Sequence, residues 1–482
     1  MRQIDHWIGG AEVASTSGRR TPVFNPATGL IQAEVGMASN EDVDTAVAVA
    51  GDAFGDWRST SLSARSEIMF AFRHLVEAHT DDLASLVTAE HGKVHSDAVG
   101  EVTRGLENVE FACGIPNLLK GGFSEQVSTG IDVHSIRQPL GVVAGVTPFN
   151  FPVMVPLWML ANAIACGNTF ILKPSEKDPS AALLLGELLA KAGLPAGVFN
   201  VVQGDKVAVD GLLDHPDVRA VSFVGSTPVA RSIYSRGTAN GKRVQALGGA
   251  KNFTVMMDDC LWDKSVANVI DSAFGCAGQR CLATSIVVGV GAAHGKLREL
   301  LPAAAKKVKV GYGMDAGVTM GPVISAAHKE KVLAYIEKGL KEGAELLVDG
   351  RNCKVDGYPK GHFIGPTIFA KVSPNMAIAS EEIFGPVLCL LEAPTLDDAI
   401  KTAKSHPFAN AASIYTQNGS SARAFAKEID ASMVGVNIGV AAPMAYFTFG
   451  GNKGSFFGDL KAHGSDSIRF YTQNKTSIQR WW

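Results

Sequence analysis

From Leu140 onward, short apolar segments alternate with stretches of helical periodicity, and this alternation restricts the fold more than any other feature. Five segments have the length and composition of buried strands: 141–147, 169–173, 198–202, 220–224 and 243–247. Each interval between them can hold a helix, most clearly 179–193. Such an alternation is typical of a parallel sheet with helices on both faces and ligands at the carboxyl ends of its strands. The sequence therefore predicts an α/β domain with a ligand site at that edge.

A second series of strands and helices predicts a second α/β domain. It begins near Phe253, includes the apolar segment 285–290 and ends around 435–437. The alternating segment 131–138 and the tail 468–482 are predicted as strands without an obvious sheet of their own. We expect them to be arms that join a partner subunit.

The first hundred residues are predicted to be mostly helical. Ser39 and Asp42 have the spacing of a capping box at a helix start. Amphipathic stretches follow at 68–76, 83–87 and 99–111. These helices are expected to form a layer that packs against a sheet.

Composition excludes several functional classes. With 482 residues, 46% of them hydrophobic and 19% charged, the chain is too long for one small module and can build large cores. The 44 lysines and arginines against 47 aspartates and glutamates give a net charge of −3. That balance offers no electrostatic footprint for nucleic acid or an anionic membrane. The longest apolar region, 153–166, is too short for a membrane span and is broken by Pro156 and Asn162.

Seven scattered cysteines in a chain of this length are typical of free thiols in a reducing compartment. The first residues show no basic stretch followed by an apolar run, so no signal peptide is expected. These features predict a cytoplasmic globular protein, and its size favours an enzyme.

Two strand ends carry candidate nucleotide-binding residues. After the fourth strand, Gly225 permits close backbone approach, and Ser226 and Thr227 begin a helix whose free N–H groups favour a phosphate. A simple helix cap is the other interpretation of these hydroxyls. At the end of the second strand, Lys173 and Glu176 suit ribose hydroxyls, and the carboxylate disfavours a 2′-phosphate. A solvated loop is the other interpretation of this pair.

Cys281 is the candidate nucleophile. Gly-Gln-Arg breaks the helical pattern just before it and places the permanent charge of Arg280 beside it, which favours the thiolate. Most lone cysteines are buried small hydrophobic residues. That interpretation is kept for four others: Cys113, Cys166, Cys353 and Cys389.

Asn150 is the candidate oxyanion donor. It lies between aromatic residues and prolines in PFNFP, directly after the first strand. Its side-chain N–H groups suit a developing oxyanion, a contact worth about 3–4 kcal/mol in other enzymes. An ordinary turn asparagine is the plainer interpretation.

Two further patterns are weak. The glycines 289, 291 and 295 follow a strand, but His294 stands where GxGxxG requires glycine, so a plain strand-to-helix loop is expected. Cys276 and Cys281 have no second pair with metal-ligand spacing, so no metal site is predicted.

Taken in order, PFNFP, KPSE, FVGST, a glycine–lysine turn, GQRC and EEIFGP resemble the aldehyde dehydrogenase superfamily over nearly the whole chain. The resemblance implies a Rossmann-type NAD-binding domain, a second α/β catalytic domain and a small β oligomerisation arm. It implies Cys281 as the nucleophile, with Asn150 and the Cys281 backbone N–H as the oxyanion hole. The cofactor-binding residues it implies are Thr147, Phe149, Lys173, Glu176, Lys177, Gly225, Ser226, Gly248, Glu382 and Phe384.

The glycine–lysine turn departs from the pattern of hydrolytic family members. Those members carry a general base in Glu-Leu-Gly-Gly-Lys, whereas this chain has Ala246 or Leu247 there, depending on the alignment. Water, with a pKa of about 15.7, needs a base to attack a thioester at neutral pH. A thiol with a pKa of about 8.5 is already a few per cent thiolate. The departure favours coenzyme A as acceptor, and a weakened or inactive hydrolase is the competing interpretation.

Two arginines narrow the resemblance to the CoA-acylating methylmalonate-semialdehyde dehydrogenases. Arg104 lies in RGLENVEF and Arg280 in GQRC, and YTQ begins at Tyr471. In that group the two arginines grip the substrate carboxylate, as guanidinium pairs do through charge-assisted bidentate bonds. Phe253 replaces the group's usual histidine, Leu247 replaces its polar residue, and the segment 441–454 carries its own sequence. The exact semialdehyde therefore stays open.

The resemblance implies NAD-dependent, CoA-acylating oxidative decarboxylation of malonate or methylmalonate semialdehyde to acetyl-CoA or propionyl-CoA, CO₂ and NADH. One alternative is a hydrolytic NAD-dependent semialdehyde dehydrogenase that releases a free acid. The other is a catalytically silent NAD-binding or structural protein. The expected domains are an NAD-binding domain (1–119 and 139–247), a catalytic domain (248–445) and an oligomerisation arm (120–138 and 460–482). The chain is expected to form a homodimer or homotetramer.

Overall fold

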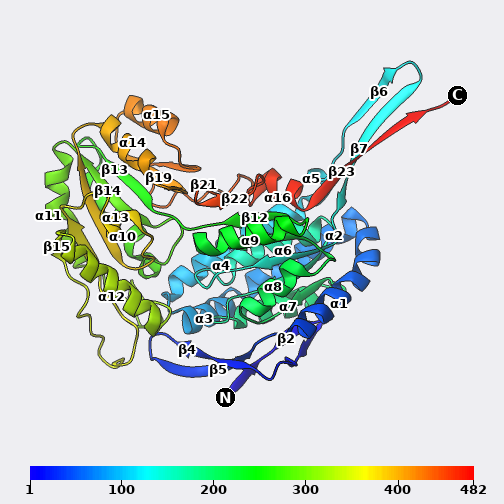
Figure 1. Cartoon of the computed structure of the whole chain (residues 1–482), viewed down its shortest axis with the longest axis horizontal. Coiled ribbons are helices and arrows are strands. Elements are labelled where there is room, and N and C mark those ends of the chain that lie inside the picture. The colour runs from blue at the N-terminus through cyan, green and yellow to red at the C-terminus, as the bar shows by residue number, and fades with distance from the viewer.

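The computed structural model describes residues 1–482, and the chain forms two α/β lobes and a projecting arm (Figure 1). The first lobe is built on an eight-stranded sheet in the order β22-β12-β11-β8-β9-β10-β2-β3. Its five central strands are parallel and are the five predicted ones: β8 (Val142–Val146), β9 (Thr169–Lys173), β10 (Phe199–Val201), β11 (Val218–Val224) and β12 (Arg243–Leu247). Strand order reverses between β8 and β11, and ligands of open α/β sheets bind at such a switch point.

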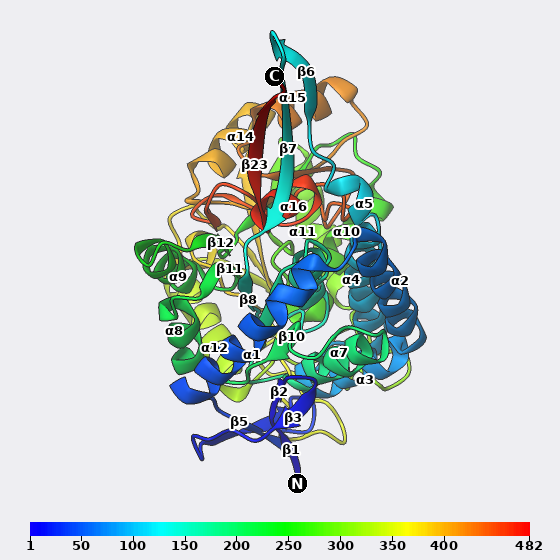
Figure 2. The same ribbon diagram turned by 90° about the vertical axis from the view of Figure 1, so that its right-hand side faces the viewer.

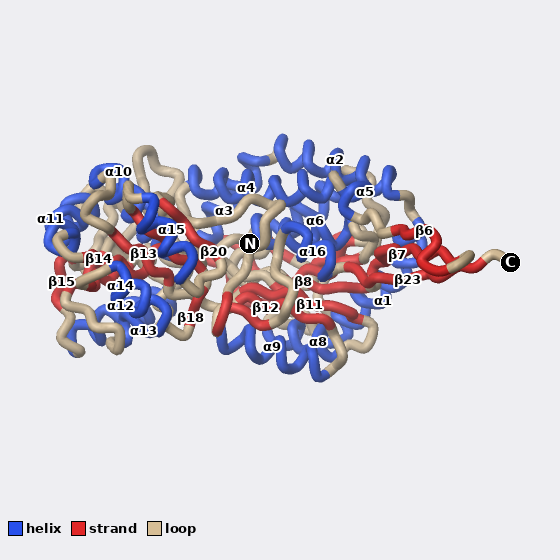
Figure 3. The backbone as a smooth tube through the Cα atoms, turned by 90° about the horizontal axis from the view of Figure 1, so that it is seen from above, coloured by secondary structure: helices blue, strands red, loops and turns tan.

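Helices cover both faces of this sheet, as predicted (Figure 3). Alternate residues of its strands point to opposite faces and so supply two separate cores. One face carries α6 (Met154–Ala165) and α7 (Ser180–Lys191), with an outer layer of α2 (Leu62–Ala78), α3 (Thr80–His91), α4 (His95–Cys113) and α5 (Ile115–Leu118). The other face carries α1 (Asn40–Ser59), α8 (Lys206–Asp214) and α9 (Thr227–Ala239). The predicted capping box of Ser39 and Asp42 starts α1.

The first 36 residues differ from the prediction. They form five strands: β1 (Arg2–Ile4), β2 (His6–Ile8), β3 (Ala11–Val13), β4 (Arg20–Asn25) and β5 (Leu30–Gly36). β2 and β3 extend the first sheet, and β1, β5 and β4 form a three-stranded sheet. Trp7 pairs with Val201, so the partner of β2 lies far along the chain. A strand this short is defined by that partner and not by its own periodicity. The mostly helical prediction for the first hundred residues therefore does not hold for residues 1–36.

The second lobe is the predicted second α/β domain. Its sheet has the order β15-β16-β17-β14-β13-β19-β20, and only β15 is antiparallel to its neighbour. The strands are β13 (Asn252–Met256), β14 (Thr284–Val290), β15 (Glu345–Val348), β16 (Thr367–Ala370), β17 (Val387–Ala393), β19 (Ala411–Tyr415) and β20 (Met433–Val436). The helices are α10 (Trp262–Phe274), α11 (Ala293–Ala305), α12 (Ala326–Lys341), α13 (Ala377–Ser380), α14 (Leu396–Ser405) and α15 (Gly419–Glu428). Residues 248–251 carry the chain from the first sheet to the second.

The arm is a three-stranded antiparallel sheet of β6 (Phe123–Ser128), β7 (Ile131–Pro139) and β23 (Thr472–Arg480), and it projects from the first lobe (Figures 1 and 2). The two segments that lacked a sheet in the sequence therefore pair with each other. The strand prediction for residues 468–471 is wrong, because α16 (Gly464–Phe470) precedes β23 and Tyr471 is buried in the core of the first lobe.

Three short strands complete the structure: β18 (Phe408–Ala409) pairs with β21 (Asn452–Lys453), and β22 (Phe456–Phe457) pairs with β12. None of the helices combines the length and the apolar character that crossing a membrane requires. All seven cysteines are free thiols. Cys353 is partly exposed, contrary to the prediction, because it lies in the loop between β15 and β16.

Candidate active site

A cavity of about 510 Å³ lies between the two lobes, and Cys281 is part of its wall. The first lobe contributes one face of α4, which includes Arg104, the loop residue Phe151 and the start of α6. The second lobe contributes the turn that contains Arg280 and Cys281. The structure therefore brings together the predicted nucleophile and both predicted carboxylate-binding arginines.

The turn before Cys281 has an unusual backbone. Cys276, Ala277 and Gly278 have φ values of 52°, 52° and 71°, so three successive residues adopt left-handed conformations. A Cβ at Gly278 would lie 2.2 Å from the Gly385 carbonyl oxygen, so only glycine fits there. Left-handed conformations cost about 1–2 kcal/mol per ordinary residue, and such strain is concentrated at functional sites.

Two asparagines hold the backbone of Cys281, the predicted nucleophile. The Cys281 carbonyl oxygen accepts hydrogen bonds from Asn252 Nδ2 at 2.9 Å and Asn410 Nδ2 at 3.0 Å. Asn150, on the loop after β8, is buried and donates from Nδ2 to the Gln279 carbonyl oxygen at 3.0 Å, two residues before Cys281. The predicted oxyanion donor of the first lobe thus meets the cysteine turn of the second.

Burial dominates the electrostatics of Cys281. Burial, with a contribution from Glu382, raises the pKa of the Cys281 thiol to about 12, and Arg280 opposes this only weakly. The Arg280 guanidinium points to Asp97, with an Nη2–Oδ1 distance of 2.8 Å, and its Nε donates to Cys276 Sγ at 3.2 Å. Arg280 therefore favours the Cys281 thiolate, as expected, but its effect is small, and burial keeps the pKa of this thiol above its usual value.

We expect alkylation of Cys281 by iodoacetamide to accelerate about tenfold per pH unit between pH 7 and 9, because the thiolate reacts and its fraction rises this steeply below a raised pKa. Glu382→Gln removes a negative charge, lowers the pKa of Cys281 and should increase the rate severalfold wherever Glu382 is ionised. Mass spectrometry of the Cys281 peptide measures both rates.

The matched control for this experiment is Glu381→Gln, whose carboxylate is exposed and contacts Tyr335 and Lys338 instead. This variant should alkylate within twofold of the unaltered chain. A rate that levels off below pH 8 would contradict the raised pKa.

The two arginines are engaged to different extents. Arg104 binds both carboxylate oxygens of Glu107 through Nη1 at 2.8 and 3.0 Å. Its Nη2 donates to the carbonyl oxygens of Ala442 and Pro443 at 3.3 and 2.9 Å. Arg280 keeps Nη1 without a hydrogen-bond partner. An incoming carboxylate therefore finds a free donor on Arg280 but must replace existing partners on Arg104.

The carboxyl edge of the first sheet gathers the predicted dinucleotide residues. Thr147, Lys173 and Gly225 stand at the ends of β8, β9 and β11, which are neighbours in the sheet. Thr147 Oγ1 is buried without a hydrogen-bond partner, and Lys173 Nζ lies 3.4 Å from Glu176 Oε2. Ser226 makes no side-chain cap on α9. Pro228 has no N–H, so the uncapped N–H groups of the first turn are those of the other residues, and their lack of a cap favours phosphate binding over simple capping.

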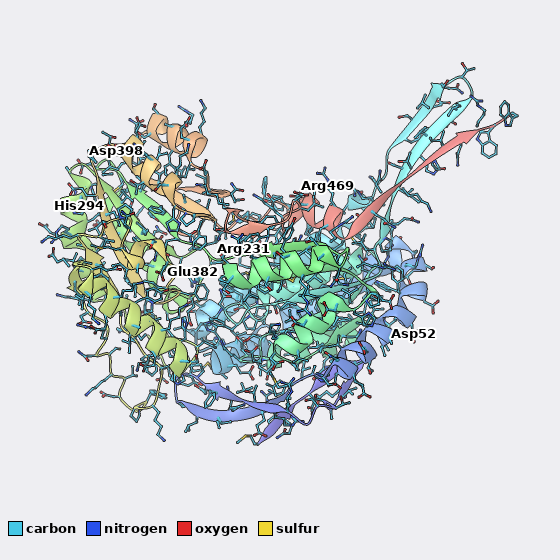
Figure 4. All side chains as sticks on the ribbon, viewed as in Figure 1. Asp52, Arg231, His294, Glu382, Asp398 and Arg469 are labelled. Atoms are coloured by element: carbon cyan, nitrogen blue, oxygen red, sulfur yellow. The ribbon has the colours of Figure 1, made fainter.

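A second group of predicted cofactor residues meets where the lobes join. The rings of Phe149 and Phe384 pack edge to face with centroids 5.9 Å apart, and Lys177 Nζ lies 5.1 Å from the Phe149 ring. Glu382, which is labelled in Figure 4, accepts a hydrogen bond at Oε1 from the Ala250 N–H at 2.8 Å. Gly248 N donates to the Ser455 carbonyl oxygen at 2.9 Å, which fixes the turn beneath them. Their roles toward a cofactor stay predictions.

The two residues that the alignments place at the position of the general base, Ala246 and Leu247, lie in different cores. Leu247 belongs to the core that contains Leu282 and against which Cys281 packs. Ala246 faces the other core, beside α8 and α9. Leu247 therefore lies in the same apolar core against which Cys281 packs, on the opposite face of β12 from Ala246. Neither side chain has a group that takes a proton.

Sequence reasoning missed several residues of the cavity wall. Asp97, Glu101 and Asn108 line it together with Arg104, at spacings of three or four residues along α4. This polar stripe on one helix face was a visible signal. His463 gave no signal: it has a φ of 69°, and burial, then Arg104, lowers the pKa of its ring to about 3. Its ring lies 4.4 Å from that of Trp158, and both of its nitrogens are buried without partners.

The Cys281 turn, the buried Asn150 and the carboxyl edge of the first sheet together agree with one family. Residues 13–477 match the aldehyde dehydrogenase family, and the chain belongs to it. Members of this family are enzymes, and the fold and the Cys281 turn are consistent with that class.

Similar proteins cover the whole chain. Malonate-semialdehyde dehydrogenase 2 of Geobacillus thermodenitrificans is 52% identical over 480 residues, which are 99% of each chain. Malonate-semialdehyde dehydrogenase of Pseudomonas aeruginosa is 49% identical over 100% of this chain and 97% of that relative. The crystal structure of methylmalonate-semialdehyde dehydrogenase from Oceanimonas doudoroffii has a TM-score of 0.98 at 50% identity, covering 100% and 99% of the two chains. A Sinorhizobium meliloti protein crystallised with NAD has a TM-score of 0.99 at 47% identity, covering 100% and 98%.

Proposed function

We propose that the protein is an NAD-dependent, CoA-acylating dehydrogenase of malonate or methylmalonate semialdehyde. The observation that carries this proposal is the single cavity that Cys281 shares with Arg104 and Arg280. It places a nucleophile next to two cations that suit the carboxylate of such a substrate. Full-length relatives at about 50% identity are named for these semialdehydes.

The chain's own groups suggest the following steps. With the substrate carboxylate on Arg280 and Arg104, the Cys281 thiol loses its proton to solvent and the thiolate Sγ attacks the aldehyde carbon. The electron pair of the C=O bond moves to the oxygen, which becomes an alkoxide. Asn150 Nδ2 and the Cys281 N–H stabilise that oxygen. NAD⁺, when bound, accepts the hydride, and a thioacyl group remains on Cys281.

Release of the product follows from the position of the carboxylate. It lies β to the thioester carbonyl, so its loss as CO₂ leaves the electron pair in a thioester enolate, which a proton then quenches. The thiolate of coenzyme A attacks the remaining acyl carbon, and Cys281 leaves as its thiolate. Neither Ala246 nor Leu247 supplies a base, which favours this acceptor over water.

The residues at the sheet edge fit NAD. The unpartnered Thr147 hydroxyl and the uncapped N-terminus of α9 suit a ribose and a pyrophosphate. Glu176 disfavours a 2′-phosphate, so NAD⁺ is preferred over NADP⁺. The Sinorhizobium meliloti relative, whose structure contains NAD, supports the same assignment.

The arm supports assembly into a homodimer or homotetramer. Phe123, Ile478 and Trp482 are exposed on it, and apolar side chains on a projecting sheet suit a second subunit. Seven free thiols favour a cytoplasmic location.

The proposed function predicts the products. With malonate semialdehyde, NAD⁺ and coenzyme A, equimolar acetyl-CoA, CO₂ and NADH should form, and chromatography with a carbonate trap measures them. A free acid formed without coenzyme A would favour the hydrolytic alternative. The same assay with NADP⁺ should be at least about tenfold slower, and an equal or higher rate would contradict the role of Glu176.

A further inference from the structure

Lys93 and Glu101 form an ion pair that is wholly inside the protein. Lys93 lies between α3 and α4, Glu101 lies on α4, and their Nζ and Oε2 atoms are 2.6 Å apart. Both side chains are 0% exposed. Burying two charges costs several kcal/mol per ion unless the remaining donors and acceptors are satisfied, so their other partners matter.

Those other partners all lie in one loop. Lys93 Nζ donates to the Asn150 carbonyl oxygen at 2.6 Å. Glu101 Oε1 accepts from the Val153 and Met154 N–H groups at 2.8 and 3.1 Å, at the start of α6. Lys93 Nζ also lies 4.2 Å from the centroid of the Phe151 ring. One ion pair therefore holds both ends of segment 150–154.

The backbone of segment 150–154 is thus held by the Lys93–Glu101 pair, which we call the clamp, and the side chain of Asn150 points from it toward the other lobe. Its Nδ2 donates to the Gln279 carbonyl oxygen, and Gln279 is in turn held by Ile324 N, which donates to Oε1 at 3.0 Å. The clamp on the first lobe and the Gln279 contact on the second thus determine where the Asn150 amide stands relative to Cys281. A misplacement of about 1 Å at a reacting centre can cost about a hundredfold in rate.

We propose that Lys93 and Glu101 are positioning residues for Asn150, which fix its amide where the alkoxide forms on the substrate of Cys281. This inference rests on the oxyanion role proposed for Asn150. Burial by itself lowers the pKa of Lys93, but its neighbours, Glu101 first among them, raise this pKa above its usual value.

The test compares Lys93→Met in the unaltered chain and in Asn150→Ala. The rate constant of the first NADH turnover is measured by stopped flow with saturating NAD⁺ and aldehyde. Both malonate semialdehyde and uncharged propanal are used, so the test stands if the proposed substrate is wrong. Asn150→Ala alone measures the oxyanion role on which the inference rests.

If Lys93 acts through Asn150, Lys93→Met slows the first turnover about 10- to 100-fold in the unaltered chain but less than about twofold in Asn150→Ala. The KM for aldehyde stays within about twofold, because substrate contacts are unchanged. An equal loss in both backgrounds would overturn the proposal, since Lys93 would then act independently of Asn150.

Two further variants keep the test decisive. Lys93→Met leaves Glu101 buried and unpaired, and this variant could fail to fold for that reason. In that case the double variant Lys93→Met with Glu101→Met, which removes both charges, takes the place of the single variant in the same comparison. The matched control is Lys242→Met. Lys242 is also buried and donates to two carbonyl oxygens, of His215 and Val218, but has no contact with the Asn150 loop. It should lower the melting temperature and leave the first turnover within twofold.

Discussion

Cys281→Ser should lower steady-state NADH formation by about 10⁴-fold or more while NAD binding persists. A serine hydroxyl is far less acidic than a thiol, and Leu247 provides no base that would activate it. Cys281 is only partly buried, and the substitution exchanges one small atom, so the melting temperature should change little. NADH absorbance measures the activity, and quenching of tryptophan fluorescence by NAD⁺ measures binding.

The control for this variant is Cys353→Ser. That thiol is partly exposed in the loop between β15 and β16 and does not line the cavity, so activity should be unchanged. Residual activity of Cys281→Ser within tenfold of the unaltered chain would exclude Cys281 as the nucleophile. An unaltered chain that itself forms no NADH with any aldehyde would favour the catalytically silent alternative.

Arg280→Gln should lower kcat/KM for malonate semialdehyde by about 10²- to 10³-fold and for propanal by less than about tenfold. Losing one partner of a desolvated, hydrogen-bonded charge pair costs about 2–5 kcal/mol, and only the charged substrate makes that pair. Arg280 lines the cavity together with Cys281. Steady-state kinetics with the two aldehydes give the ratio.

The companion variant Arg104→Gln should lower kcat/KM for malonate semialdehyde, relative to propanal, by a smaller factor. The reason is that this arginine already binds Glu107 and the carbonyl oxygens of Ala442 and Pro443. Equal losses for both aldehydes in Arg280→Gln would mean that Arg280 supports the turn and does not recognise the substrate. Its contacts with Cys276 and Asp97 make that outcome the natural competitor.

Where the signal was local, the sequence was sufficient to predict the fold. The five parallel strands could be found because each is a short apolar run with a helix on either side. The strands before Ser39 could not, since β2 acquires its identity from pairing with β10. Likewise α16 follows from burial against the first lobe and not from its own periodicity.

The site shows the same division. Residues at strand ends could be predicted, because parallel strands deliver their carboxyl ends to one edge. The direction of Arg280 could not, because it depends on the left-handed turn at 276–278 and on Asp97 from α4. The positioning role of Lys93 could not be predicted either, because it depends on a hydrogen bond to Asn150, 57 residues away in the sequence.

A stopped-flow NADH trace shows whether the acyl group leaves Cys281 to a thiol or to water. Malonate semialdehyde and NAD⁺ are mixed with the protein, with and without coenzyme A. We expect a burst of about one NADH per Cys281 in both traces, followed by steady turnover only with coenzyme A. Steady turnover without coenzyme A would contradict this expectation, because water would then attack the thioester with the help of a base. Glu382, the half-buried carboxylate that influences the pKa of Cys281, would be the first residue to replace.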